Sequence, residues 1–363
     1  MNVQTTDLLP KKSYSGFNLN FREESDNLYI WYRKPQGGKI VEFRFPLKIN
    51  INEDFIKNLS LCLGDGLNNP NKKNTHCNFS NKNLDLINIV YDWWQSLGVP
   101  KEKISVYAFT NSKKDINLIE KKIITKLGCK SVRFYTSNRH KSFTSFIQIG
   151  NSIFQSFYLN LFKKLKKEIY KNKEFRHAFL SGLFAAEGHV KHSIYGTPES
   201  ISYSFNPKTE QDLAKFVKIC LEKEGIISKI SKDKLYFCNY EQMLKFFRLG
   251  LVGLHSDKES KFKYLCKTID LTLHFKDNFL NSLDYSSQGK LAKKLGCSQS
   301  AISQNIKHNR FNLNLFKLAF PSFTEGEIIK NTDFVYIRTS KIEDKETISF
   351  LINLQSEDIK CQN

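Results

Sequence analysis

Two acidic residues have the neighbours needed for chemistry, because each ends a short apolar run and is followed by glycine. Asp65 ends the run Leu59-Ser-Leu-Cys-Leu-Gly-Asp, and Glu187 ends the run Leu180-Ser-Gly-Leu-Phe-Ala-Ala-Glu. Both runs predict the last turns of helices, where a carboxylate lies at the negative end of the helix macrodipole at a cost of some tenths of a kcal/mol. Because this unfavourable placement occurs twice in matching frames, it indicates that both acids are needed at one site.

Small residues within the two runs predict that the helices pack closely. Ser60 and Gly64 stand four residues apart in the first run, and so do Gly182 and Ala186 in the second. On a helix such residues share one face, and faces made of small residues let two backbones approach closely, as is best documented for membrane helices. If the helices pack in parallel, their C-terminal ends coincide and the two acids lie close together.

Two adjacent carboxylates repel each other unless a cation lies between them. Mg²⁺ fits this position because it takes oxygen ligands and keeps several waters, and we expect Mn²⁺ to substitute for it. The predicted metal site comprises Asp65 and Glu187 with the residues that precede them, Gly64 and Ala186. Next to a phosphodiester, the metal would activate water and stabilise the leaving oxygen. The alternative is that both helices are ordinary buried helices with an accidental terminal acid.

Length, composition and charge favour a globular protein that binds nucleic acid. The chain has 363 residues, 40% of them hydrophobic, which is enough for two or three domains. The formal charge of +20 attracts polyanions, and the 30 Phe and 15 Tyr suit contacts with bases and sugars. The eight cysteines form neither a Cys-x-x-Cys pair nor a Cys/His cluster, which indicates free thiols.

Membrane association is not expected from the sequence. No apolar run reaches membrane-spanning length, and the first residues lack the features of a signal peptide. We therefore expect no membrane partner and a location in the cytoplasm or nucleoid, with an organelle as the alternative.

The surroundings of the two acids repeat. Phe79-Ser-Asn-Lys82 followed by Gly98 matches Phe205-Asn-Pro-Lys208 followed by Gly225 with almost the same spacing. This predicts a helix-strand-strand-helix unit present twice. The expected domains are a β-rich segment at 1–50, repeat units at 51–172 and 173–269, and a C-terminal domain at 270–363.

Local patterns predict the other elements. Strands are expected at 28–32, 40–45, 76–79, 104–109, 131–136, 143–149, 201–205, 228–230, 234–238, 333–338 and 347–351, and helices at 83–97, 153–171, 210–224 and 241–251. The strands 131–136 and 143–149 are expected to form a pair joined by a basic turn, 138–141. The segment 347–351 is expected to close a short β-rich tail.

The segment 288–306 has the pattern of a helix-turn-helix. Gly296 allows the turn and Ser298 caps the second helix, while Leu291, Ala292, Leu295, Ile302 and Ile306 form the inner faces. The outward residues, suited to groove edges and phosphates, are Gln299, Ser300, Ser303, Gln304 and Lys307. A plain helical hairpin is the alternative.

With these motifs the chain resembles the LAGLIDADG homing endonucleases in their monomeric form with two motifs. The likeness covers residues 53 to about 268 and includes Leu254-His-Ser-Asp-Lys-Glu-Ser-Lys261. The resemblance implies an α+β fold of two pseudo-symmetric αββαββα units, whose motif helices form the shared interface and whose sheets form a β-saddle over the major groove of a long DNA site. It also implies that Asp65 and Glu187 bind Mg²⁺ and that each active site cuts one strand.

The resemblance suggests further catalytic residues. Family members often have a lysine or glutamine near the metals at the end of a strand, and Lys82 and Lys208 are equivalent in the repeat. Both are therefore predicted to be catalytic, with a solvated lysine at a helix start as the alternative. The first motif departs from the family in Asn58, where an apolar residue is usual.

DNA contacts are expected from outward positions on the strands, although each residue alone could be an ordinary surface residue. In the first unit these are Arg133, Tyr135, Arg139, His140 and Lys141, and in the second Lys191, His192, Tyr203, Lys232 and Lys234. As a set they give the strands a polar face beside an apolar one. Phosphate contacts from such residues would make binding fall steeply with salt.

Two other functions stay open. Bacterial transcription regulators that join a LAGLIDADG-like domain to a C-terminal helix-turn-helix have lost the acids, and the presence of Asp65 and Glu187 argues against that reading. An RNA maturase that assists intron splicing is the second alternative, because a basic saddle could bind either polymer. The sequence thus favours a site-specific, metal-dependent double-strand DNA endonuclease.

Overall fold

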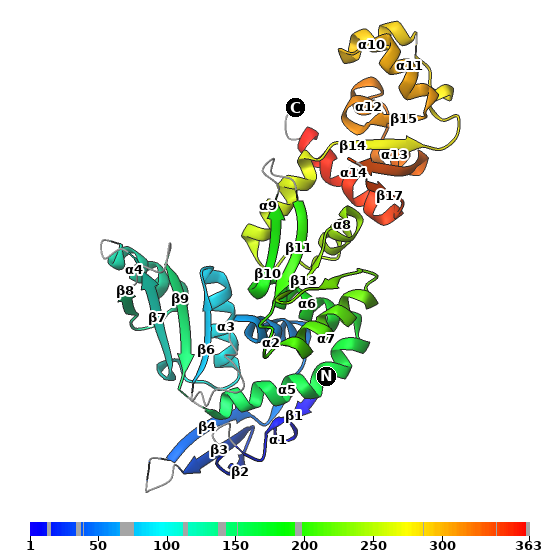
Figure 1. The fold of residues 1–363 in the computed structure, drawn as a ribbon. Helices are drawn as coiled ribbons and strands as arrows, with labels where there is room; N and C mark the ends of the chain where they lie inside the picture. The colour runs from blue at the N-terminus through cyan, green and yellow to red at the C-terminus, as the bar shows by residue number, and fades with distance from the viewer. Residues whose placement is uncertain are drawn as a thin grey trace. The chain divides into compact units, whose positions relative to one another are not determined.

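A computed structural model of the chain has an α+β fold, as expected (Figure 1). It describes residues 1–12, 16–33, 38, 40–65, 76–111, 115–136, 143–150, 152–192, 198–285, 287–338 and 340–360. Its contacts divide the chain into two compact units. The first contains Met1–His189, Tyr203–Glu224 and Ile230–Leu235, and the second contains Val190–Ser202, Gly225–Lys229 and Tyr236–Asn363. Among the helices described, none is long and apolar enough to cross a membrane.

The N-terminal part of the first unit is β-rich, as predicted. Its elements are β1 (Asn2–Gln4), α1 (Thr5–Leu8), β2 (Asn20–Glu24), β3 (Asn27–Arg33), β4 (Ile40–Pro46) and β5 (Lys48–Asn50). Strands β2, β3 and β4 form an antiparallel sheet, and β1 pairs with β5. Phe43 and Phe45 of β4 pack against Phe154 of the helix α5 (Ser152–Lys171), and these aromatic contacts join this sheet to α5.

A four-stranded sheet follows, with helices on one side. Its strands, in sheet order, are β6 (Cys77–Asn81), β9 (Thr144–Ile149), β7 (Ile104–Thr110) and β8 (Arg133–Thr136). The accompanying helices are α3 (Leu84–Ser96), the short η1 (Lys101–Lys103) and α4 (Ile116–Leu127). Helix α3 packs on β6 and β9, and α4 packs on α3.

The expected pairing of 131–136 with 143–149 is wrong. Strand β7 lies between β8 and β9, and β8 runs parallel to β7. A parallel neighbour requires a crossover connection, and α4 supplies it. The sequence reading missed α4, whose signal is the helical spacing of Ile119, Ile123 and Leu127, all of them buried.

The second sheet has the strand order β10 (Gly188–His192), β11 (Pro198–Ser204), β13 (Lys234–Phe237) and β12 (Lys229–Ile230). Its residues are divided between the two units. The helices that follow these strands in sequence are α7 (Gln211–Lys223) and α8 (Tyr240–Arg248), close to their predicted positions.

The C-terminal part contains a third four-stranded sheet. Its order is β15 (Arg310–Asn312), β14 (Leu271–Phe275), β16 (Thr332–Ile337) and β17 (Ser340–Ile342). The helical elements here are α9 (Ser256–Thr268), η2 (Leu280–Ser282), α10 (Gln288–Leu295), α11 (Gln299–Lys307), α12 (Leu313–Ala319), α13 (Glu325–Asn331) and α14 (Lys345–Lys360).

The expected strand 347–351 is wrong, because these residues begin the helix α14. Ile348, Leu351 and Ile352 are fully buried, which fits the helical period, and α14 packs on α8, α9 and α13. Thr347 and Ile348 are β-branched and suggest a strand in a short window. Burial of one helical face outweighs that local preference.

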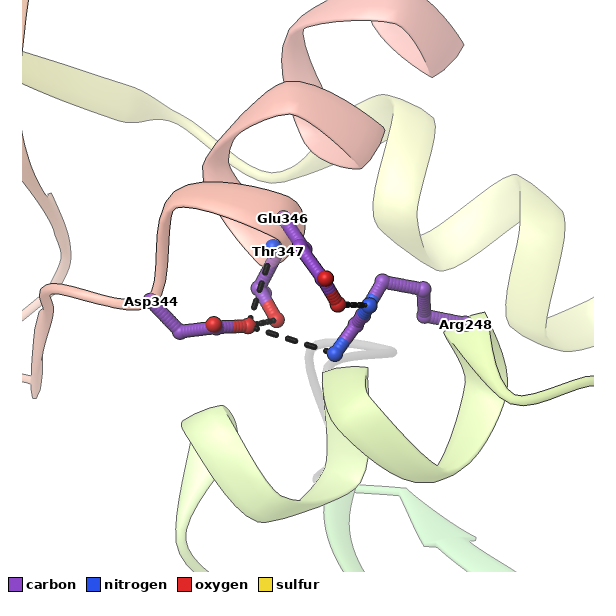
Figure 2. Close-up of polar contacts among 4 residues, drawn as sticks. All are labelled: Arg248, Asp344, Glu346 and Thr347. Carbon is purple, nitrogen blue, oxygen red and sulfur yellow. Dashed lines mark hydrogen bonds and ion pairs between the residues drawn. The ribbon is translucent and has the colours of Figure 1, made fainter. Parts of the chain in front are cut away.

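Charged side chains fix the start of α14 to the end of α8 (Figure 2). Arg248 Nη2 lies 3.4 Å from Asp344 Oδ2, and Arg248 also pairs with Glu346. The same Asp344 oxygen accepts a hydrogen bond from the Thr347 main-chain N–H at 3.0 Å, as a helix cap does. Burial alone would raise the pKa of Asp344, but the Thr347 hydrogen bonds and the Arg248 charge outweigh it and lower the pKa.

Stability should therefore depend on Asp344 in a defined pH range. Because the folded-state pKa lies below the ordinary value of 3.8, this carboxylate stabilises the fold above that pH and loses its effect as the pH falls through the folded-state pKa. Asp344→Asn should lower the free energy of unfolding by about 1 kcal/mol or less at neutral pH, because the group is partly exposed. Urea unfolding at neutral and acid pH measures the difference, which should vanish in acid. The exposed Asp277→Asn is the control, and an equal effect of both variants would contradict the assignment.

Candidate metal site at the paired helices

The helices α2 (Glu53–Asp65) and α6 (Lys173–Glu187) pack directly on each other. A Cβ atom built at Gly64 would lie 2.5 Å from Ala186 Cβ and 3.1 Å from Glu187 Cγ. A Cβ atom built at Gly182 would overlap Ser60 Oγ and the main-chain oxygen of Lys57. Gly182 lies against Ser60, and four residues later on each helix Ala186 lies against Gly64, so the two helices run in the same direction. The predicted parallel packing through small residues is confirmed.

The local sequence explains why both helices begin where they do. Asn52 Oδ1 accepts a hydrogen bond from Phe55 N at 2.8 Å, and Asn172 Oδ1 accepts one from Phe175 N at 2.9 Å. Each asparagine thus satisfies one of the amides that a helix start leaves unpaired. The middle of both helices is buried on all sides, from residue 59 to 63 in α2 and from 178 to 185 in α6. Such helices hold their last residues in fixed positions.

Asp65 and Glu187 are the last residues of these helices, and both side chains are partly exposed. Asn81 Nδ2 donates a hydrogen bond to Asp65 Oδ2 at 2.6 Å. Asn81 itself is oriented, because its Oδ1 accepts a hydrogen bond from Asn83 N at 2.8 Å. The sequence reading missed Asn81; its only sequence signal is its place at the end of a strand, immediately before Lys82.

Glycine after the second acid serves a steric purpose. Gly188 has an extended backbone, with φ −76° and ψ 142°, and not the left-handed conformation of many helix caps. A Cβ atom there would collide with the ring and the main-chain oxygen of Phe184. The residue after Asp65, Gly66, lies outside the described residues.

The chemistry of the donors at these helix ends fits Mg²⁺. Asp65 and Glu187 would supply carboxylate oxygens, and the predicted contributions of Gly64 and Ala186 would be main-chain carbonyl oxygens, so the predicted ligands are oxygens only. Within the described ranges, no group of three or more His, Cys, Asp or Glu side chains could hold a metal. Mg²⁺ is usually bound by one or two carboxylates with several retained waters, so a two-carboxylate site suits it better than a site for a fully caged ion.

The two predicted catalytic lysines are exposed, and each follows a strand in sequence. Lys82 follows Asn81 directly, between β6 and α3. Lys208 lies in a turn after β11, where its main-chain N–H donates a hydrogen bond to Asn206 Oδ1 at 3.0 Å. Their catalytic role stays a prediction.

The predicted DNA-contacting residues fall into different environments. Arg133 and Tyr135 are exposed on β8. Lys191 is exposed and pairs with Glu199 at 2.7 Å. His192 is half-buried, and burial, with the Lys261 charge, lowers its pKa. The remaining residues of the first unit, Arg139, His140 and Lys141, lie outside the described residues.

The expected outward position of Tyr203 is wrong. Its side chain is fully buried, and its hydroxyl donates a hydrogen bond to the main-chain oxygen of Leu180 at 3.2 Å. Its ring also meets Phe184 edge-on, 5.4 Å between centroids. Side chains alternate between the two faces of a strand, and Tyr203 lies on the face that packs against α6.

Lys232 and Lys234 are brought together with a third lysine at one pocket of about 480 Å³. The third is Lys215 of α7, and all three are exposed. Phe205 and Ala214 form part of the buried wall. The three lysines give this surface the positive charge that phosphate groups need.

The predicted helix pair of the C-terminal part is present as α10 and α11. Gly296 joins them in the left-handed conformation, with φ 65°, and Ser298 Oγ caps α11 through Ala301 N at 3.2 Å. Of the predicted inner residues, Leu291, Ala292, Ile302 and Ile306 are buried, and Leu295 is half-buried. The predicted outward residues are all exposed: Gln299, Ser300, Ser303, Gln304 and Lys307. DNA binding by this pair stays a prediction.

Comparison with known proteins relates part of this architecture to a family. Residues 174–249, which run from α6 through α8, match the LAGLIDADG-like domain. Comparison with curated proteins finds no match. Similar solved structures have TM-scores below 0.5.

Mesophilic variants of the homing endonuclease I-DmoI are 14% identical, with a TM-score of 0.31 over 55% of this chain and 96% of that chain. An I-DmoI variant in complex with its target DNA in the presence of Mg is 15% identical, with a TM-score of 0.30 over 55% of this chain and 97% of that chain. Full-length DUF199/WhiA from Thermatoga maritima is 15% identical, with a TM-score of 0.35 over 76% of this chain and 94% of that chain.

Proposed function

We propose that this protein is a site-specific DNA endonuclease that uses Mg²⁺ to cut both strands of a long duplex target. The observation that carries the proposal is the parallel packing of α2 and α6, which brings Asp65 and Glu187 to one end of a buried helix pair. The buried helices pack through glycine and serine contacts and hold both carboxylates in place. Two carboxylates held close together repel each other, which favours binding of a cation between them. The match of 174–249 to the LAGLIDADG-like domain supports the same class of function.

In this proposal the protein's own groups bind and orient. Asp65 and Glu187 hold Mg²⁺, and Asn81 keeps one Asp65 oxygen in place. A divalent ion held there would supply positive charge beside the scissile phosphate and would make water a better nucleophile. Lys82 and Lys208 would offset the negative charge that develops on the phosphate.

Recognition of the duplex would come from strand residues and from the C-terminal helix pair. The residues proposed, on the strands or in the segments between them, are Arg133, Tyr135, Arg139, His140, Lys141, Lys191, His192, Lys232 and Lys234. With a formal charge of +20, the chain would bind with a steep dependence on salt. Helix α11, with its exposed face, would add contacts beyond the strands, and one chain carries both acids, so we propose a monomer.

A cleavage assay tests the proposal. Purified protein is incubated with Mg²⁺ and a library of candidate intron and intein insertion sites, and cut ends are sequenced. Discrete double-strand cuts at one site would support the endonuclease. Tight, sequence-specific binding without cleavage under any divalent metal would instead favour a transcription regulator, and selective binding to intron RNA would favour a maturase.

Removing the Asn81 side-chain amide, which donates to Asp65, should weaken Mg²⁺ binding without removing a metal ligand. Asn81→Ala should raise the Mg²⁺ concentration for half-maximal cleavage by about 10- to 100-fold, the usual cost of losing an outer partner of a metal ligand. Asn88→Ala is the matched control, because it removes an exposed Asn–Asp hydrogen bond on α3. If the two variants have the same Mg²⁺ dependence, the Asn81 contact has no part in metal binding.

A further inference from the structure

A pocket lies at the edge of the first sheet, where β7 extends beyond the start of β8. The pairing of β8 with β7 begins at Tyr107, whereas β7 itself begins at Ile104. Beside this stretch, residues 104–106 of β7 and residues 128–131 before β8 line a pocket of about 270 Å³. Tyr91 of α3 lines it as well. The whole lining belongs to the first compact unit.

The pocket is separate from the strand face proposed to contact duplex DNA. Side chains alternate between the two faces of a strand. Ile104 and Val106 are buried, and Val106 lies opposite Ile147 of β9, on the face that α3 covers. Arg133 also lines the pocket, but its guanidinium lies over the ring of Tyr107, 5.8 Å from the centroid, on the other face. We therefore leave Arg133 out of the site.

Two lysines give the pocket a positive charge. Lys101 and Lys130 both line it, and both are exposed at its rim. Gly128 ends α4 in the left-handed conformation, with φ 61°, and a Cβ atom built there would lie 3.9 Å from Lys101 Nζ, which places that ammonium group beside the pocket wall. Glu102 is the one acid of the lining. The lining therefore suits an anionic group.

The Tyr91 side chain supplies a buried donor at the same place. Tyr91 is 1% exposed, yet its hydroxyl has no hydrogen-bond partner within the part of the chain that the structure describes. Burial first, and then the neighbouring Cys129 and Asp92, raise the pKa of Tyr91, so the phenol keeps its proton at neutral pH. A buried hydroxyl without a partner is costly. A ligand that brought an acceptor oxygen into the pocket would remove that cost.

We infer that this pocket binds the phosphate group of a small phosphorylated molecule, with Lys101 and Lys130 paired to its charge and the Tyr91 hydroxyl donating to one of its oxygens. A phosphate monoester carries about −1.5 to −2 charges at pH 7 and three strong acceptor oxygens, enough for these three donors together. A backbone phosphodiester carries one charge, and its strand would have to reach the side of the sheet that α3 covers. The inference does not depend on the proposed endonuclease.

Alkylation of Cys129 tests the inference, because this half-buried thiol lines the pocket. A bound phosphate would cover the thiol and disfavour its reactive thiolate. The full-length protein is treated with iodoacetamide in EDTA, and the labelling rate of each cysteine is read by mass spectrometry. Inorganic phosphate and methyl phosphate should each slow labelling of Cys129 relative to KCl of equal ionic strength. Labelling of the exposed Cys238 should not change.

Substitutions identify the donors through the phosphate concentration that gives half-maximal protection. Tyr91→Phe keeps the ring and should raise that concentration about tenfold or more, the usual effect of losing one hydrogen bond to a charged group. Tyr91→Phe should still fold, since it removes only a hydroxyl that has no partner in the described chain. Tyr158→Phe is the matched control, because Tyr158 is fully buried in α5 and does not line the pocket. Lys101→Gln combined with Lys130→Gln should also weaken protection.

Three results would overturn the inference, whether or not the protein cuts DNA. The first is equal labelling of Cys129 in phosphate, methyl phosphate and KCl. The second is an equal effect of Tyr91→Phe and Tyr158→Phe on protection by phosphate. The third is protection by a DNA duplex but by neither small phosphate, which would assign the pocket to the nucleic-acid backbone.

Discussion

Replacing Asp65 with Asn, or Glu187 with Gln, will lower the rate of DNA cleavage by about 10³-fold or more. Each change removes the negative charge of one ligand but keeps its size. A metal that activates water and stabilises the leaving oxygen supplies several kcal/mol of transition-state stabilisation. Because both acids end helices that are buried and packed through small residues, neither neighbour can move in to replace a lost carboxylate. The loss should therefore be nearly complete in each single variant.

Conversion of supercoiled plasmid carrying the target to nicked and linear forms measures this effect. The binding affinity of both variants for the same target should stay within a few-fold of the parent, since the phosphate-contacting cations are unchanged. Asp54→Asn is the matched control on the same helix, because Asp54 is exposed and pairs only on the surface with Lys57. Cleavage at the parental rate by either acid variant would show that the metal site lies elsewhere.

Replacing Gly182 with Val will destabilise the fold by about 3 kcal/mol or more. A side chain at Gly182 would overlap Ser60 Oγ and the main-chain oxygen of Lys57 on the facing helix. The Ser60 side chain could rotate away, but the Lys57 main-chain oxygen cannot move without separating the helices. The largest measured costs of overpacking a core in this way are several kcal/mol. Both motif helices would shift, so cleavage should fall as well.

Urea unfolding followed by circular dichroism measures the change in the free energy of unfolding. Gly326→Ala is the control, because Gly326 lies in α13 with no atom within 4 Å of a built Cβ. That variant should be neutral or more stable by up to about 1 kcal/mol. Ser60→Gly should not rescue Gly182→Val, because the Lys57 oxygen remains. A Gly182→Val variant as stable as the parent would contradict the close packing of α2 on α6.

Local features of the chain could be predicted from the sequence because the interactions that produce them are short-range. The ends of α2 and α6 follow from Asp65 and Glu187 with the apolar runs before them, and the small residues four apart predicted which faces meet. The turn between α10 and α11 follows in the same way from Gly296 and the Ser298 cap.

Other features depended on residues distant in sequence. Strand β7 separates β8 from β9 because α4 carries the chain back in the parallel direction, and no local signal distinguishes that order from a hairpin. The sequence pattern predicts that Tyr203 points outward. In the structure its ring packs against Phe184 and its hydroxyl donates to the main-chain oxygen of Leu180, so it is buried. The segment 347–351 is predicted to be a strand from its local sequence. In the structure it is part of helix α14, which packs on α8 and α9.

For the proposed site, the sequence by itself determined which two acids end the paired helices. Only the tertiary structure decided their surroundings: the closeness of Gly64 to Glu187 and the hydrogen bond from Asn81 to Asp65. The physical reason is that helix ends and caps are set by neighbours within a few residues, whereas contacts between helices and strands are set by which apolar faces find each other when the whole chain is compact.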